Sequence, residues 1–154
     1  MDLKTQLTSD TLDQLGLEEP CCVEPTAPLR EVLQQLQQRR AGSALVCREG
    51  RLVGIFTERD ALRLLAQEAD LDQAIQEVMT PNPVSLPASA TVADAIRTMS
   101  QGGYRRVPVV DELGRPLGVI KVAHIVHYLV DFFPQTVYNL PPDPNVVMQE
   151  REGA

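Results

Sequence analysis

A glycine, a threonine and an aspartate stand three residues apart in the segment Gly54-x-x-Thr57-x-x-Asp60, between an apolar stretch and a helical pattern. A strand that ends where a helix begins exposes unpaired backbone N–H groups and the positive end of the helix dipole, which together attract an anion. There the Thr57 hydroxyl can donate a hydrogen bond to a phosphate, and the Asp60 carboxylate can accept hydrogen bonds from two neighbouring sugar hydroxyls. The same spacing is typical of a helix-capping pair with Thr57 as the N-cap. The residues therefore support two interpretations, a phosphate and sugar site or a helix start.

An equivalent segment in the second half of the chain, which begins at Gly118, carries different chemistry. Lys121 and His124 stand there at the places of Thr57 and Asp60. Neither a lysine nor a neutral histidine offers the carboxylate that holds two adjacent hydroxyls. Lys121 can still attract a phosphate as a point charge. We therefore expect one competent site per chain and a second site that is lost or altered.

The remaining reactive side chains form no pattern that is typical of catalysis or of metal binding. His124 and His127 lie one helical turn apart, but neither a Cys/His cluster nor an obvious acidic ligand accompanies them. The cysteines are neither an even disulfide set nor a C-x-x-C pair; Cys47 falls in an apolar strand, and Cys21-Cys22 marks a strand entry, with a redox role as the less favoured alternative. No Ser/His/Asp grouping, P-loop or G-x-G-x-x-G motif occurs. We expect no catalytic residue, no metal and no required cofactor.

The elements that must position these residues occur twice in the same order. The helical pattern at 29–36 corresponds to 92–99, and the apolar run 44–46 corresponds to 107–109, with the same offset in both cases. A unit of about 60 residues is too long for a solenoid repeat, but two half-domains with poor cores can pair and bury a common face. Pairing leaves clefts between the copies, where small ligands usually bind.

Each copy is expected to fold as β-α-β-β-α. The first copy has strands at 22–23, 44–47 and 52–56 and helices at 29–40 and from residue 57. The second has strands at 84–86, 106–110 and 117–120 and helices at 91–99 and 122–133. We therefore divide the chain into a polar leader (1–17), a first domain (18–77), a second domain (78–133) that begins at the Pro-rich hinge 79–83, and a Pro-rich tail (134–154).

Composition excludes several classes of protein. A hydrophobic fraction of 44% in 154 residues supports a real core. A net charge of −7, a 4% aromatic fraction and the lack of Trp argue against a nucleic-acid partner. No apolar run reaches the roughly 20 residues of a membrane span, and the polar, acidic start resembles no secretory signal. We expect no membrane partner and a cytoplasmic location.

Several motifs together resemble the CBS (cystathionine-β-synthase) domain. In the second copy they are Met79-Thr80-Pro81-x-Pro83-Val84, the run 106–111 and the closing Gly118-Val119-Ile120. In the first copy they are Leu52-Val53-Gly54-Ile55 and Thr57-x-x-Asp60. Each motif is loose by itself, but their order, spacing and duplication make the resemblance specific, and it covers roughly residues 18–133.

The resemblance implies a mixed α/β fold in which two pseudo-twofold-related β-α-β-β-α units pack through their sheets. Clefts between such units often bind adenine nucleotides, and such pairs usually regulate rather than catalyse. On this basis we expect a regulatory module that senses AMP, ADP or ATP in one cleft and signals to an effector protein or through self-association. The alternatives are a protein-interaction module that binds no nucleotide and a sensor of another adenosyl ligand such as S-adenosylmethionine.

The resemblance also implies roles for individual residues. In this family the signature on Gly54, Thr57 and Asp60 binds ribose and phosphate, and a basic residue before the central strand of the other unit often faces the phosphate. Arg105 and Arg106 hold that place, whereas the first copy has Gly42-Ser43 there. This one-sided charge favours a single site, although two solvated or acid-paired arginines are the alternative.

Two further surfaces follow from the resemblance. We expect Met79, Pro83 and Val84 to form the wall of an adenine pocket, with ordinary core packing as the alternative. Family members commonly form flat homodimers through their helices, and the apolar helix 122–133 is the expected interface. The tail 134–154 is either draped on the body or a recognition segment.

Overall fold

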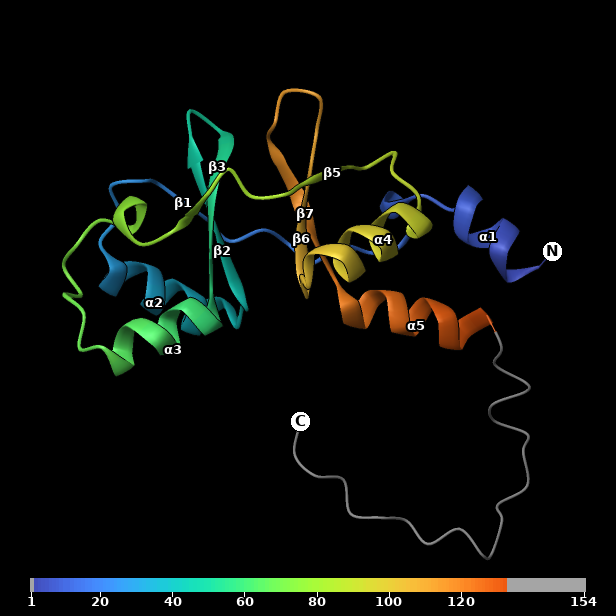
Figure 1. Ribbon diagram of the computed structural model, residues 1–154. Coiled ribbons are helices and arrows are strands. Elements are labelled where there is room, and N and C mark those ends of the chain that lie inside the picture. The colour runs from blue at the N-terminus through green and yellow to red at the C-terminus, as the bar shows by residue number, and fades with distance from the viewer. Residues whose placement is uncertain (1, 133–154) are drawn as a thin grey trace, which may run out of the picture.

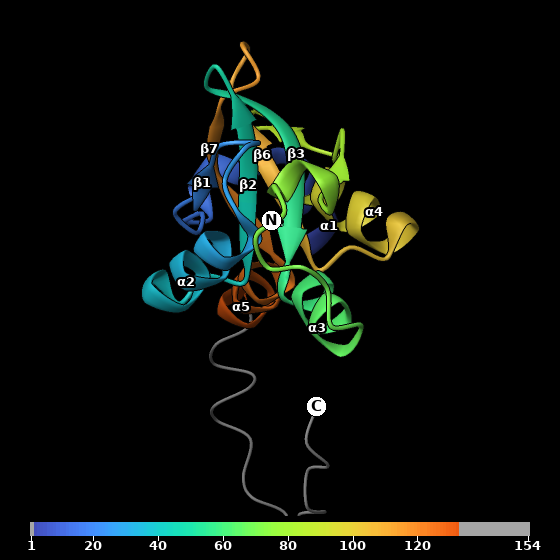
Figure 2. The same cartoon turned by 90° about the vertical axis from the view of Figure 1, so that its left-hand side faces the viewer.

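Two β-sheets stand side by side in the middle of the molecule, with helices packed on both sides of the pair (Figures 1 and 2). The computed structural model describes residues 2–132, so the expectations for Phe133 and for the tail 134–154 lie outside the described residues. The first sheet has the strand order β1-β2-β3-β4 and the second the order β5-β6-β7. These two sheets and their helices confirm the mixed α/β fold.

Both units follow the expected order of elements. The first contains β1 (Cys22–Val23), α2 (Leu29–Arg39), β2 (Ser43–Arg48), β3 (Arg51–Thr57) and α3 (Glu58–Ala66). The second contains β5 (Leu86–Pro87), α4 (Val92–Gly102), β6 (Arg106–Val110), β7 (Pro116–Lys121) and α5 (Val122–Phe132). The leader and the connection between the units supply α1 (Leu3–Ser9), the 3₁₀ turns η1 (Leu12–Gln14) and η2 (Ile75–Glu77), and β4 (Thr80–Pro81).

Strand pairing is the same in both units. The first strand of each unit pairs in parallel with the second, and the second pairs with the third as an antiparallel hairpin. The turn of the first hairpin consists of Glu49 and Gly50, whose φ angles are +53° and +79°. Positive φ at both positions gives a two-residue turn the twist that the flanking strands need.

Helix α2 then buries its apolar stripe, which comprises Leu29, Val32 and Leu36.

The chain segment just before each unit pairs with the sheet of the other unit. Strand β4 lies in the Pro-rich hinge, yet Thr80 pairs with Ile55 and Pro81 with Gly54 of the first sheet. In the second sheet, Glu18 and Val119 exchange two backbone hydrogen bonds of 3.0 and 2.9 Å. The hinge is therefore a strand as well as a connection, and the strand expected at 84–86 begins at Leu86. Both units are interlocked by these crossed segments.

The leader packs on the second unit. Leu12 is fully buried in the core cluster of that unit, and its N–H donates to the carbonyl of Ala90 (3.0 Å). The N–H of Val92 donates to the carbonyl of Asp10 (2.9 Å), and the Tyr128 hydroxyl donates to the Asp10 carboxylate (2.5 Å). These contacts hold α1 beside α4, as Figure 1 shows.

The two sheets meet through a small apolar cluster that contains side chains from both units. Leu45 and Cys47 of β2 pack against Val119 of β7, and all three are at least nine-tenths buried. The Leu52 N–H donates to the carbonyl of Gly114 across the same boundary (2.9 Å). Truncation of a buried leucine such as Leu45 to alanine typically reduces the free energy of unfolding by about 2–5 kcal/mol. The units therefore form one body, and the ends of β3 and β7 lead into α3 and α5 on the same side of it (Figure 1).

Candidate functional site

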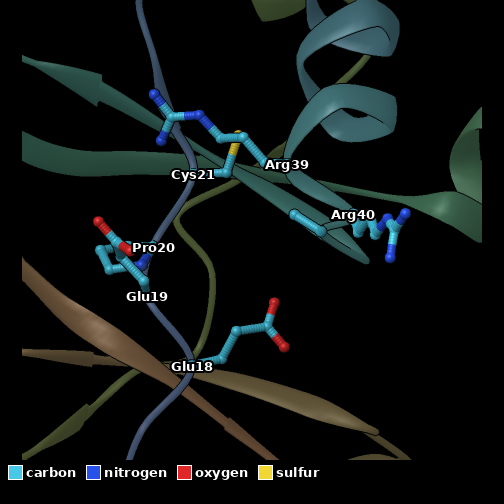
Figure 3. Close-up of a pocket in the computed structure, with 7 residues that line it drawn as sticks. Glu18, Glu19, Pro20, Cys21, Arg39 and Arg40 are labelled. Carbon is cyan, nitrogen blue, oxygen red and sulfur yellow. The ribbon is translucent and has the colours of Figure 1, made fainter.

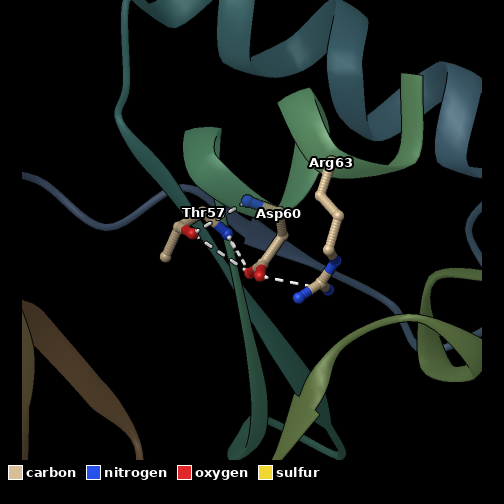
Figure 4. A network of polar contacts seen from close by, with 3 residues as sticks. All are labelled: Thr57, Asp60 and Arg63. Atoms are coloured by element: carbon tan, nitrogen blue, oxygen red, sulfur yellow. Dashed lines mark hydrogen bonds and ion pairs between the residues drawn. The ribbon is translucent and has the colours of Figure 1, made fainter. Parts of the chain in front are cut away.

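Thr57 and Asp60 form a complete capping box at the start of α3 (Figure 4). The Thr57 N–H donates to Asp60 Oδ2 (3.0 Å), and the Asp60 N–H donates to Thr57 Oγ1 (3.3 Å). The Thr57 hydroxyl also donates to Asp60 Oδ2 (3.0 Å). The structure thus confirms the capping interpretation, and it holds both side chains at a helix N-terminus, where an anion is stabilised.

The second carboxylate oxygen of Asp60 is held only by a weak surface contact. Asp60 Oδ1 lies 3.4 Å from Arg63 Nη2, and the Arg63 side chain is 60% exposed. An exposed pair of this kind contributes little, about 0–1 kcal/mol. Asp60 Oδ1 can therefore exchange Arg63 for hydroxyl donors while Oδ2 keeps capping the helix.

Arg106 reaches across from β6 to the first unit. Its guanidinium lies against the backbone of Gly42, where an added Cβ atom would overlap with Nη2. Gly42 therefore admits this side chain because it has none of its own. The Gly42 carbonyl accepts the N–H of Glu58, the first residue of α3 (3.1 Å), so Arg106 lies beside the start of that helix. Arg105 does not share this position, since its side chain is exposed.

Two buried polar atoms at this place have no hydrogen-bond partner among residues 2–132. They are the Oγ of Ser43, a residue that is 2% exposed, and the Nε of Arg106. Ser43 pairs with Thr57 in the β2-β3 ladder and follows Gly42, so both atoms lie near the start of α3. Buried polar groups are nearly always paired, so these two have hydrogen-bonding capacity that the protein itself does not use. Ser43 was not predicted to be a site residue. It is the residue of the first copy that corresponds to Arg106, and it is the only buried polar side chain in the described part of the chain.

The three residues expected to form an adenine wall are placed differently from one another. An added Cβ atom at Gly54 would overlap with the Met79 sulfur, so Met79 packs directly on this glycine. Met79 is half-buried against the first core cluster, to which Pro83 and Val84 do not belong. Val84 is 44% exposed and Pro83 is partly exposed. The structure thus gives Gly54 and Met79 a packing contact, and it gives Pro83 and Val84 no core role.

At the start of α5, other residues make the equivalent contacts. The Lys121 N–H donates to His124 Nδ1 (3.0 Å), so the imidazole ring replaces the Asp60 carboxylate as acceptor. Burial, and then the positive charge of Lys121, lower the pKa of His124, which favours the neutral ring that this bond needs. The Lys121 amine pairs with Glu18 (2.7 Å), and an added Cβ atom at Gly118 would lie 2.6 Å from Leu17 Cβ. Leu17 therefore lies against β7, and Glu18 lies beside this second helix start.

Two hollows among the described residues are of note, and neither is lined by Thr57 or Asp60. A cavity of about 410 Å³ is lined by residues of both charges, 18–21 from the segment before β1 and 39–41 after α2 (Figure 3). An apolar groove of about 320 Å³ lies between α2 and α3. The cavity adjoins the second helix start through Glu18, the partner of Lys121.

His124 and His127 have no metal-binding cluster around them within the described residues. Within residues 2–132, no group of three or more histidine, cysteine, aspartate or glutamate side chains is arranged to hold a metal ion. In the same part of the chain, no helix is long and apolar enough to cross a membrane.

The comparisons with known proteins agree with this architecture. The sequence pattern of the CBS domain family matches residues 15–67 and 75–131, and the chain therefore belongs to the CBS domain family. An uncharacterized 17.7 kDa protein of Acidianus ambivalens is 26% identical over 121 residues, which are 78% of this chain and 73% of that protein. Four relatives from Arabidopsis thaliana are much longer, and the chain spans only 18–23% of them.

Two solved structures are similar to this chain over most of its length. The CBS domain protein PAE2072 from Pyrobaculum aerophilum, complexed with AMP, has a TM-score of 0.70 and 28% identity and covers 79% of this chain and 98% of its own. The CBS domain pair of protein MJ0100, in complex with 5′-methylthioadenosine and S-adenosyl-L-methionine, has a TM-score of 0.70 and 25% identity and covers 77% and 98%. This chain is thus a tandem pair of CBS domains.

Proposed function

We propose that this CBS pair is a regulatory module that binds one adenine nucleotide (AMP, ADP or ATP) at the start of α3. The observation that carries the proposal is the pair of buried, unpartnered polar groups on Ser43 and Arg106, among residues 2–132, beside a helix N-terminus. A phosphate accepts hydrogen bonds from such donors and is attracted by both the guanidinium and the helix dipole. Asp60 would hold the ribose hydroxyls through Oδ1, and the Thr57 hydroxyl would turn its single proton from Asp60 Oδ2 to the phosphate.

Other adenosyl ligands are the second candidate, because the solved relatives include a pair bound to S-adenosyl-L-methionine and 5′-methylthioadenosine. These ligands would use the same ribose contact with Asp60, but they carry no phosphate. Arg106 is positively charged, and the N-terminus of α3 carries the positive end of the helix dipole. Both favour an anion over a sulfonium cation. We therefore rank a nucleotide phosphate above them.

The proposed mechanism is a shift between conformations. A nucleotide that contacts α3 of one unit and Arg106 of the other binds the closed arrangement more tightly and so increases its population. The change would be transmitted to an effector protein or to a second copy of the chain. We propose a regulatory rather than an enzymatic role, because the chain is a tandem pair of CBS domains and such pairs usually regulate. The cytoplasm remains the proposed location, and 18–77 and 78–133 the proposed domain bounds.

Self-association through the helices is part of this proposal. Helices α3 and α5 expose apolar side chains at equivalent positions of the two units, Leu62 (71% exposed) and Val126 (50%). Leu65 of α3 is also half exposed beside the apolar groove. The interface would therefore involve both α3 and α5, in keeping with the expectation that helices of both halves take part, of which only 122–133 was named. Light scattering of the parent and of Leu62→Glu tests this, with a dimer expected for the parent and a monomer for the variant.

A module that binds no nucleotide is the alternative from a different class. In that case Thr57 and Asp60 only cap α3, and a partner protein binds elsewhere. The capping box is indeed complete without any ligand, which favours this alternative.

Titration by calorimetry with AMP, ADP, ATP, adenosine and S-adenosylmethionine separates these functions. We expect saturable binding of at least one nucleotide and a large loss of that affinity in Arg106→Leu, because a hydrogen bond to a charged group contributes about 1.5–3 kcal/mol. Adenosine, which lacks the phosphate, should bind both proteins equally. S-adenosylmethionine binding alone would support the second candidate, and no heat with any of the five would favour the nucleotide-independent module.

A further inference from the structure

The groove between α2 and α3 leaves apolar side chains uncovered on the first unit. Leu33 and Leu36 of α2 and Leu62 and Leu65 of α3 line it. Leu62 is 71% exposed, and Leu65 is 51% exposed. Large apolar side chains that gather at one exposed, concave place usually mark a binding site. No segment of residues 2–132 covers these two leucines.

The second unit differs at the corresponding place, because one end of the chain packs there. Leu129 of α5 corresponds to Leu65 in the duplicated pattern. It is partly buried against the second core cluster, to which the leader contributes Leu12. The neighbouring Tyr128 hydroxyl donates a hydrogen bond to Asp10 of the leader. The leader thus packs on the second unit, and the groove is the place on the first unit where a comparable segment is missing within residues 2–132.

The tail at the other end of the chain has the composition of such a segment. Val146-Val147-Met148 is an apolar run, and the carboxylates of Glu150 and Glu152 follow it closely. An occupant of the groove needs apolar side chains, and a short extended or helical segment can supply them without a folded domain.

The charges beside the groove favour an acidic occupant. Arg39 and Arg40 directly precede Ala41, which lines the groove. Both arginines are exposed, and neither takes part in an ion pair within residues 2–132. The groove residue Glu58 is the acidic exception. An apolar groove beside two available arginines therefore complements an apolar run that is followed by carboxylates.

The start of α5 lies close to the groove, on the same side of the two sheets (Figure 1). The N–H of Val122, the first residue of α5, donates to the carbonyl of Arg105 (3.0 Å). The next residue, Arg106, lies against Gly42, whose carbonyl accepts the N–H of the groove residue Glu58. The length of one arginine side chain therefore separates the two places.

The tail is long enough to return to the groove from the far end of α5. That helix has 11 residues, so its length is about 16 Å. Residues 133–146 can span up to about 46 Å, whereas residues 133–137 can span only about 17 Å. The apolar run 146–148 can thus reach the groove, but the earlier apolar residues Val137 and Tyr138 use up their reach along α5.

The size of the groove favours the tail over a second copy of the chain as its occupant. Its lining consists of eight residues. A stable interface between two proteins involves about 20–30 residues on each side. The groove by itself therefore suits a segment of a few side chains.

We propose that the apolar run Val146-Val147-Met148 of the same chain binds in the groove between α2 and α3, with Glu150 and Glu152 toward Arg39 and Arg40. The first unit then carries the tail as the second unit carries the leader. The proposal depends neither on nucleotide binding nor on self-association.

The first test is hydrogen exchange with mass spectrometry on the full chain and on Val147→Asp. A charge in the apolar run should release it from the groove, so amides of residues 33–41 and 58–65 should exchange severalfold faster, while those of α4 stay unchanged. The matched control is Val137→Asp, which places the same charge in the run that cannot reach and should leave all rates unchanged. Arg39→Gln combined with Arg40→Gln should give a smaller increase than Val147→Asp.

Equal exchange in Val147→Asp and the parent chain would overturn the proposal. Protection of the groove that falls when the parent chain is diluted would also overturn it, because a second copy would then be the cover.

The second test traps the contact directly in a Cys22→Ser background, which removes the exposed native thiol. Leu65→Cys combined with Val147→Cys should form a disulfide within one chain on mild oxidation, identified by peptide mass spectrometry. Leu65→Cys combined with Val137→Cys is the control and should form far less. Equal yields in the two pairs, or a link between two chains, would contradict the proposal.

Discussion

The starts of α3 and α5 occupy equivalent places in the two units and solve the same structural problem with different side chains. At the start of α3, the Asp60 carboxylate accepts a hydrogen bond from the Thr57 N–H at 3.0 Å. At the start of α5, the His124 ring accepts the corresponding hydrogen bond from the Lys121 N–H, also at 3.0 Å. Only Asp60 has a second acceptor oxygen to offer, and, among residues 2–132, only the start of α3 lies beside unpartnered buried donors. Both helix starts therefore have a cap, whereas a second carboxylate oxygen is present only at the start of α3.

The largest expected effect separates capping from ligand binding. Asp60→Ala should weaken nucleotide binding by about 1–3 kcal/mol, roughly 5- to 150-fold, if Asp60 holds the ribose through charge-assisted hydrogen bonds. Asp94→Ala is the matched control, because Thr91 and Asp94 form the same capping box at the start of α4. Both variants should lose about 1 kcal/mol of unfolding free energy. Calorimetry should show the affinity loss in the first alone, and equal affinities would remove Asp60 from the site.

The next experiment restores the missing chemistry at α5. Lys121→Thr combined with His124→Asp recreates the acceptor pattern of Thr57 and Asp60 and removes the ion pair with Glu18. We expect the number of nucleotides bound per chain to rise from one to two, with the new site the weaker. The measurement is the stoichiometry of a nucleotide titration. An unchanged value would mean that Leu17 and Glu18, and not residues 121 and 124, close the second cleft.

The equivalent glycines of β3 and β7 should differ in their tolerance of alanine. At Gly118 an added Cβ atom meets Leu17 Cβ at 2.6 Å and the Glu18 carbonyl at 3.0 Å, so the leader must move. At Gly54 it meets the flexible end of Met79. Gly118→Ala should reduce the free energy of unfolding by about 1–3 kcal/mol, and Gly54→Ala by less. Denaturant unfolding of both variants checks the order, and the reverse order would contradict the packing described for the leader.

The smallest effect is a pH dependence that belongs to the α5 cap. The pKa of His124 lies below its ordinary value of 6.5, mainly through burial, with Lys121 and His127 lowering it and Glu18 raising it. The unfolded chain then binds more protons, and the free energy of unfolding falls as the pH drops below 6.5. His124→Asn keeps a cap acceptor that does not titrate. Denaturation at pH 7 and pH 5.5 should show a smaller loss in this variant than in the parent.

Much of the architecture could be predicted because it depends on local periodicity. The repeat, the strand and helix order, and the Thr57 cap follow from apolar spacing and from capping chemistry. The pairing of β4 with the first sheet could not be predicted. This strand has only two residues, Thr80 and Pro81, and lies among prolines, so it has no alternating apolar pattern that would indicate a strand. The apolar pattern of the leader indicated packing on the main body or a partner, but not that Leu12 would join a core whose other buried members come from the second half of the chain.

The candidate site was predictable in part, because some of its residues belong to local sequence motifs. Thr57, Asp60 and Arg106 could be named from the motif and from the charge difference between the copies. Ser43 could not, because its significance lies in a missing hydrogen bond, within the described part of the chain, that only three-dimensional packing reveals. The contact of Glu18 with Lys121 is also a long-range one, and it turns an apparent phosphate-attracting lysine into half of an ion pair.

Stoichiometry of nucleotide binding tests the central claim most directly. The difference between α3 and α5 predicts that AMP, titrated calorimetrically into the full chain, saturates at one per chain, and that Asp60→Ala weakens this event while His124→Ala leaves it unchanged. Saturation at two per chain, or AMP binding that is lost in His124→Ala and kept in Asp60→Ala, would contradict the account.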